Sequence, residues 1–157
     1  MNEKEISSIV DSVIRAVMAN ADNMTLDMAM TLAAKVREKA KGMGVNAVVA
    51  VSNKGANPVL VQCSDDSYIA SYDIALNKAY TAVALKMSTS KLATLAAPGS
   101  PLYGIQFTNQ GKIVIFGGGE PLLNSKGEII GGLGVSGGSE AQDTALAAYG
   151  KEIFEKG

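Results

Sequence analysis

The chain has 157 residues, of which 47% are hydrophobic and 18% charged, and its formal net charge is −1. This length suits a single domain with a sizeable core, and the composition excludes an extensively disordered chain. The charge argues against a general nucleic-acid-binding surface and against a polybasic membrane patch, both of which need excess basic residues. No apolar run reaches the roughly 18–20 residues that span a bilayer.

Histidine is absent, and Cys63 is the single cysteine. The lack of histidine excludes a Ser-His-Asp triad and removes the commonest metal ligand, so that a structural zinc site is nearly excluded. A lone thiol cannot form an internal disulfide, and the charged N-terminus does not resemble a secretory signal, which together predict a cytoplasmic protein. We interpret Cys63, near the end of a predicted strand, as a buried structural thiol.

Residues 1–19 form the clearest amphipathic pattern in the chain. Apolar residues recur at intervals of three and four and therefore share one stripe of a helix. They are Ile6, Ile9, Val10, Val13, Ile14 and Val17. Residues 20–24 are mostly polar and predict a linker. The stripe can dock on its own domain or form an oligomer contact. It can also bind a partner as a detachable helix, and the polar linker favours this third interpretation at least as much as the other two.

Residues 25–157 are predicted to form one domain. Its first helix begins at the N-cap Thr25 and ends at the glycines 42 and 44. A hairpin of strands 45–51 and 58–63 follows. Helical spacing returns over 68–87, where the many alanines predict close packing of neighbouring elements, and Ser88 caps a short helix that ends near residue 96.

Strands dominate the next part of the chain. Segments 103–108 and 112–116 are predicted as strands joined by a turn, and segments 121–123 and 128–135 as a second hairpin. The last helix begins at a capping box, Ser139 to Gln142, and runs to Phe154. Hairpins imply an antiparallel sheet that helices must cover, so the predicted fold class is α+β, an antiparallel β-sheet flanked by helices.

The glycine-rich segments 117–119 and 131–138 match neither a dinucleotide fingerprint nor a P-loop. Turns, bulges and close backbone approach are the favoured interpretation, and an anion at the N-terminus of the last helix is the alternative. Asp65, Asp66 and Asp143 are interpreted as loop or helix-start residues rather than a catalytic pair. The helical pattern alone predicts that Lys78 is a solvated lysine beside a core stripe.

Four segments in the right order resemble the GlcG/HbpS-like family, which also occurs as the C-terminal domain of PduO proteins. They are residues 71–82, 98–104, 113–122 and 130–139, followed by Gln142 and Asp143. The resemblance implies an antiparallel sheet flanked by helices, homo-oligomers and, as in several family members, haem binding. PduO proteins join this domain to a cobalamin adenosyltransferase domain, which the present sequence does not contain, so no adenosyltransferase activity is expected.

The resemblance makes Lys78, Tyr80, Thr81 and Tyr103 candidate cofactor-binding residues, because they lie in the matching segments. A lysine can pair with a haem propionate, and a tyrosine can stack on haem or ligate its iron. Without histidine, the remaining iron ligands are Met, Cys63, Tyr, Lys or a hydroxyl. The identity of a metal ligand is left open, and no catalytic residue is predicted.

Residues 1–19 lie outside these segments and resemble the short encapsulation peptides that carry cargo into bacterial microcompartments. This implies a location inside a microcompartment, with shell or cargo proteins as partners of the helix. The leading hypothesis is a non-enzymatic haem- or tetrapyrrole-binding accessory protein. The alternative is an oligomeric structural or scaffolding module without cofactor. An enzyme that uses Lys78 and the glycine loops ranks last, because no base–nucleophile pair can be named.

Overall fold

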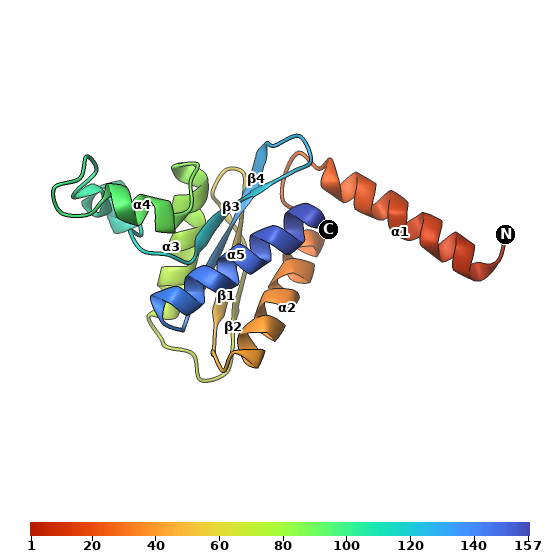
Figure 1. Cartoon of the computed structure of the whole chain (residues 1–157), viewed down its shortest axis with the longest axis horizontal. Helices are drawn as coiled ribbons and strands as arrows, with labels where there is room; N and C mark the ends of the chain where they lie inside the picture. The colour runs from red at the N-terminus through yellow and green to blue at the C-terminus, as the bar shows by residue number, and fades with distance from the viewer.

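The computed structural model describes residues 1–157 and contains a four-stranded antiparallel sheet with helices on both faces (Figure 1). The elements are α1 (Glu3–Ala19), α2 (Leu26–Gly42), β1 (Val48–Asn53), β2 (Pro58–Cys63), α3 (Ser71–Ala84), α4 (Thr89–Leu95), β3 (Gly119–Leu123), β4 (Ile129–Ser136) and α5 (Glu140–Lys156). The predicted α+β fold is confirmed. The predicted caps at Thr25, Ser88 and Ser139 are also present, because each side chain accepts a backbone N–H of its own first turn.

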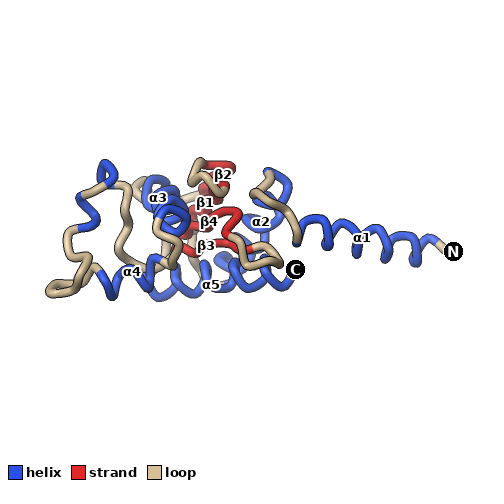
Figure 2. The backbone as a smooth tube through the Cα atoms, turned by 90° about the horizontal axis from the view of Figure 1, so that it is seen from above, coloured by secondary structure: helices blue, strands red, loops and turns tan.

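The strand order is β2-β1-β4-β3, so that β1 and β4 are central and β2 and β3 are edges. Helices α2 and α5 cover one face of the sheet, and α3 covers the other (Figure 2). Side chains alternate along β1, with Val49 and Val51 in the larger core under α2 and α5. Val48 and Ala50 face α3. Burial on both faces explains why this strand reads as a continuous β-branched run.

Helix α3 packs unusually close to β4 because glycines remove the side chains that would separate them. A Cβ atom added to Gly134 would lie 1.9 Å from the carbonyl oxygen of Ala75, and one added to Gly132 would lie 2.5 Å from that of Ala79. The close packing predicted from the alanines of this helix and the close backbone approach predicted from the glycines are both confirmed, and the structure shows that the two segments pack on each other. This approach brings the buried face of α3 directly against the sheet.

Two predicted strands are wrong. Residues 103–108 and 112–116 form no strand, and the chain there runs through two short 3-10 turns, Ile105–Phe107 and Asn109–Gly111. Within the first predicted strand, Gly104 has a φ of +94° and residues 105–107 coil into a 3-10 turn, which an extended strand cannot accommodate. The predicted helix over 68–87 is also shorter, spanning Ser71–Ala84.

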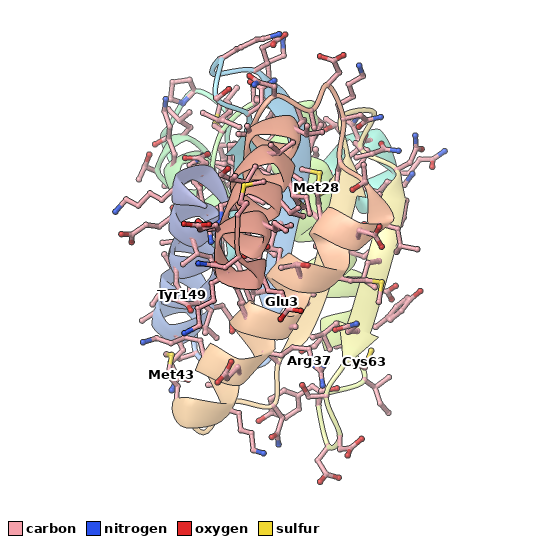
Figure 3. All side chains as sticks on the ribbon, turned by 90° about the vertical axis from the view of Figure 1, so that its right-hand side faces the viewer. Glu3, Met28, Arg37, Met43, Cys63 and Tyr149 are labelled. Carbon is pink, nitrogen blue, oxygen red and sulfur yellow. The ribbon has the colours of Figure 1, made fainter.

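Cys63 is exposed, which corrects the prediction of a buried thiol. It is the last residue of β2, and β2 is an edge strand with a neighbour on one side only. Figure 3 shows Cys63 at the outside of the body, at the end of β2. Burial in an edge strand requires that a helix cover the side chain, as happens for Leu122 of β3, and the local sequence does not specify such a cover for Cys63.

Helix α1 projects away from the body, and none of its residues is buried (Figures 1 and 2). Its N-terminus is closed by a capping box, in which Asn2 accepts the backbone N–H of Glu5 at 2.9 Å and the Glu5 carboxylate accepts that of Asn2 at 2.8 Å. No helix in the structure combines the length and apolarity needed to cross a membrane.

Candidate functional site

A buried ion pair lies where α3, β4 and α5 meet. Lys78 of α3 is fully buried, and Asp143 of α5 is 4% exposed. The Lys78 Nζ donates to the carbonyl oxygen of Val135 at 2.7 Å and to Oδ2 of Asp143 at 3.2 Å. The expectation of a solvated lysine is therefore wrong, because the close approach of α3 to the glycines of β4 turns this position inward.

An ammonium group has three N–H donors, and the two oxygens just named accept two of them. The ring of Phe116 lies over the Nζ of Lys78 at 5.1 Å from its centroid, in the range of a cation–π interaction. Gly118 has a φ of +116°, and a Cβ atom there would lie 2.6 Å from the Nζ. The glycine at this position thus leaves room for the lysine head group.

The first turn of α5 holds the other half of the site. Oδ1 of Asp143 accepts the backbone N–H of Gly138 at 2.8 Å, so both carboxylate oxygens of Asp143 have partners. Oε1 of Glu140 accepts the backbone N–H of Gly117 at 3.3 Å. Glu140 and Asp143, both in the first turn of α5, interact favourably with the positive end of the helix dipole. They also tie the two glycine-rich loops to α5.

Burial lowers the pKa of Lys78 below its ordinary value of 10.5. The nearby carboxylates of Asp143 and Glu140 oppose this change, because each favours the charged ammonium. Desolvation is the larger effect. A buried cation with a lowered pKa and a specific carboxylate partner is a recognised marker of functional sites, although structural ion pairs share it.

A cavity of about 300 Å³ adjoins the ion pair. Its lining includes Tyr68, Ser71, Ile74, Phe116, Ser136 and Asp143. Ser136 Oγ donates to Ser71 Oγ at 3.0 Å, and both serines are buried. The cavity therefore combines the aromatic and aliphatic side chains of Tyr68, Ile74 and Phe116 with buried hydroxyl groups and the carboxylates of Glu140 and Asp143.

The four candidate residues from the sequence do not come together. Thr81 is buried and connects α3 to the chain after the 3-10 turns: its Oγ1 accepts the backbone N–H of Val114 at 3.0 Å and contacts the oxygens of Asn77 and Lys112. Tyr80 is partly exposed, accepts a hydrogen bond from Asn109 at 3.2 Å, and lies under the Nζ of Lys112.

Tyr103 is 66% exposed, in the 97–112 segment at the end of the body opposite α1 (Figure 1). None of the four candidate cofactor-binding residues lines the cavity. Sequence reasoning missed the side chains that do, among them Tyr68, Ser71, Ile74, Phe116, Ser136, Glu140 and Asp143. These residues lie in or near the family-like segments, which was the available signal. No group of three or more Cys, Asp or Glu side chains is placed to hold a metal ion.

A second hollow, of about 440 Å³, lies at the base of α1 between α2, α5 and the β3–β4 turn. Its apolar lining includes Met18, Met28, Leu32, Leu123, Ile153 and Phe154. Arg15 and Lys35 are at its edge. The six stripe residues of α1 lie outside this hollow and are exposed.

Two known proteins are similar to this chain in sequence. An uncharacterised 15.0 kDa protein from the dhaT-dhaS intergenic region of Citrobacter freundii is 44% identical over 133 residues, covering 85% of this chain and 93% of that protein. The corrinoid adenosyltransferase PduO of Salmonella typhimurium is 40% identical over 110 residues, covering 70% of this chain but only 32% of PduO. The chain thus spans about a third of PduO.

Among solved structures, the PduOC:heme complex superposes with a TM-score of 0.78 at 35% identity, covering 83% of this chain and 94% of that one. The model of the family described as haem degrading protein HbpS-like matches residues 24–152, which include the sheet, the buried ion pair and the cavity. The chain therefore belongs to the HbpS-like family.

Proposed function

We propose that the chain is a haem- or tetrapyrrole-binding accessory protein that works in a bacterial microcompartment. The observation that carries the proposal is the cavity beside the Lys78–Asp143 pair, whose wall contains Tyr68, Ile74 and Phe116. Membership of the HbpS-like family and the structural likeness to a haem complex support it.

The residues of the cavity fit one edge of a tetrapyrrole. Aromatic and aliphatic side chains favour the flat apolar macrocycle, and the volume is at the lower end of the roughly 300–1,000 Å³ typical of ligand pockets. Tyr68 and Ile69, just before α3, are 73% and 98% exposed. We therefore propose a homo-oligomer in which a second copy covers these side chains and encloses the rest of the ligand.

Tyrosine is the most suitable iron ligand in a chain without histidine, since a phenolate can bind ferric haem. Tyr68 lines the cavity and is our first candidate. Tyr80 and Tyr103, proposed from the sequence, lie on other segments and are the alternatives. The Lys78 ammonium is held by Val135 and Asp143 under Phe116, so its pairing with a propionate requires Phe116 to move aside.

A hemin titration tests this proposal. Saturation of the Soret band at a fixed stoichiometry is expected, with loss or shift of the band in Tyr68→Phe. The double variant Tyr80→Phe/Tyr103→Phe removes the same hydroxyl groups at other positions and should leave the spectrum unchanged. A Soret change confined to the double variant would favour the sequence-based candidates. If hemin behaves as free hemin with every protein, the oligomeric structural module becomes the better account.

The microcompartment part of the proposal concerns α1. Its exposed stripe and its place outside the family match, which begins at residue 24, suit a targeting helix for shell or cargo proteins. Residues 1–20 fused to a fluorescent protein should form foci with a labelled shell. The same fusion carrying Val10→Asp and Val13→Asp is the control, and diffuse signal from both fusions would contradict targeting.

A further inference from the structure

Helix α1 presents a continuous apolar stripe that its own chain does not cover. The six stripe residues are between 45% and 67% exposed. Six exposed Val and Ile side chains in one row are far more than scattered surface hydrophobics, and such a surface marks a contact with another molecule. The arrangement of the stripe and of the helix base indicates which molecule that is.

The base of α1 is fixed to the body by hydrogen bonds to Ala19 and to residues within the predicted linker 20–24. The N–H of Ser125 donates to the carbonyl oxygen of Ala19 at 2.8 Å, and Ser125 Oγ donates to Asn20 Oδ1 at 2.7 Å. Asn124 Nδ2 donates to the carbonyl oxygen of Ala21 at 3.1 Å. The β3–β4 turn therefore holds the end of the helix.

Asn23 and Met24 continue this attachment. Asn23 Oδ1 accepts the N–H of Lys54 in the β1–β2 turn at 2.9 Å, and the N–H of Met24 donates to the oxygen of Ile130 at 2.9 Å. Met24 is buried in the main core. Folding α1 back onto its own body would break these contacts, so the stripe must be covered by a second molecule.

The stripe is symmetric about the midpoint between Asp11 and Ser12. Ile6 and Val17 are equally far from this point, as are Ile9 and Ile14, and likewise Val10 and Val13. When two such helices pack antiparallel about a two-fold axis at this midpoint, every apolar residue faces an apolar residue of the other copy. Such a self-complementary patch is what an isologous contact requires.

We propose that α1 pairs antiparallel with α1 of a second copy of this chain. The first turn carries Glu3 and Glu5 against one basic residue, Lys4, so a parallel pair would bring net negative charge and two like helix-dipole ends together. Asp11, the other acidic residue of α1, lies beside the midpoint and off the stripe, so it does not distinguish the two directions. The antiparallel pair separates the two first turns. It also brings the first turn of each helix to the base of the other, where Arg15 and Lys35 border the apolar hollow.

This pairing does not depend on haem binding. It goes beyond the proposed targeting role, because it covers the stripe within the protein's own assembly. A helix of a shell or cargo protein would then have to displace the second copy of α1.

Disulfide trapping in the full-length protein tests both the pairing and its direction. In a Cys63→Ser background, Ile6→Cys and Val17→Cys chains are prepared separately, one with a C-terminal tag so that mixed dimers are recognised on a non-reducing gel. Brief mild oxidation of the mixture should give mostly mixed dimers, because Ile6 faces the partner's Val17, whereas the two Ile6 positions are about 16 Å apart along the helix axis. Each variant alone should cross-link at least several-fold less.

Ser8→Cys, on the polar face, mixed with Val17→Cys is the matched control for random collision. Strong cross-linking of Ile6→Cys with itself would show a parallel pair and overturn the proposal. Equal cross-linking in the Ser8→Cys control, or none in any mixture, would overturn it as well. Independently, Val10→Asp/Val13→Asp should weaken self-association in light scattering by about tenfold or more.

Discussion

The ammonium of Lys78 and the carboxylate of Asp143 lie 3.2 Å apart although the two residues are 65 positions apart in sequence, and both are shielded from water. Their contacts join α3, β4, the loop at 137–138 and α5 into one polar cluster within an otherwise apolar interior. A buried pair of this kind costs desolvation energy, so its value to the protein lies in fixing geometry or in serving the neighbouring cavity.

Replacing Asp143 with Leu is predicted to lower the free energy of unfolding by about 3–5 kcal/mol, because removing one partner leaves a buried charge uncompensated. The double variant Lys78→Met/Asp143→Leu should cost clearly less than the sum of the two single changes, with a coupling of about 0.5–3 kcal/mol. Urea denaturation of the four proteins measures the cycle. Additive costs would show that the two groups do not interact.

The stability contributed by Lys78 is predicted to rise with pH. Because burial lowers its folded-state pKa below the unfolded value of 10.5, the unfolded chain binds more protons at this site between the two values. The cost of burying the charge is fully present below the folded pKa and is relieved as the pH rises toward 10.5. Wild type should therefore gain stability relative to Lys78→Met between neutral and alkaline pH.

Urea titrations of wild type and Lys78→Met at matched pH values check this difference. The difference in unfolding free energy between the two proteins removes the contributions of the other lysines and of the tyrosines, because both proteins contain them. If the stability of wild type relative to Lys78→Met stays constant or falls as the pH rises through the alkaline range, the lowered pKa of Lys78 is contradicted.

Gly134→Ala is predicted to be among the most damaging small substitutions in the chain. Its Cβ would lie 1.9 Å from the Ala75 carbonyl oxygen, and the backbone of α3 cannot yield without leaving the sheet. We expect a loss of about 3 kcal/mol or more, at the upper end of overpacking effects. Gly42→Ala is the control, since nothing lies within 4 Å of that position. Thermal unfolding should separate the two variants by many degrees.

Thr81→Val is predicted to destabilise the protein by about 1–3 kcal/mol, because it leaves the buried N–H of Val114 without an acceptor. Thr81→Ser keeps the oxygen and should cost less. Hydrogen exchange at Val114 offers a local readout, with faster exchange expected in the valine variant alone. A serine variant less stable than the valine variant would instead assign the role of Thr81 to its methyl group.

Local sequence signals determined the elements that depend on short-range chemistry. The helix caps at Thr25, Ser88 and Ser139 follow from side-chain oxygens that satisfy the first free N–H groups of a helix. Strand β2 begins and ends at the residues that its apolar run predicted. The prediction of strands at 103–108 and 112–116 failed because the 3-10 turn over Ile105–Phe107 and the positive φ of Gly104 depend on tertiary surroundings as well as on residue type.

The site itself was decided by tertiary structure. The sequence determined that histidine chemistry is impossible, that the fold is α+β, and that residues 3–19 carry an apolar stripe. Whether Lys78 faces water or the interior depends on the distance between α3 and β4, which is set by contacts between residues far apart in the chain. The pairing of Lys78 with Asp143, and the attachment that directs α1 outward, arise in the same way, because burial and long-range hydrogen bonds are properties of the packed molecule.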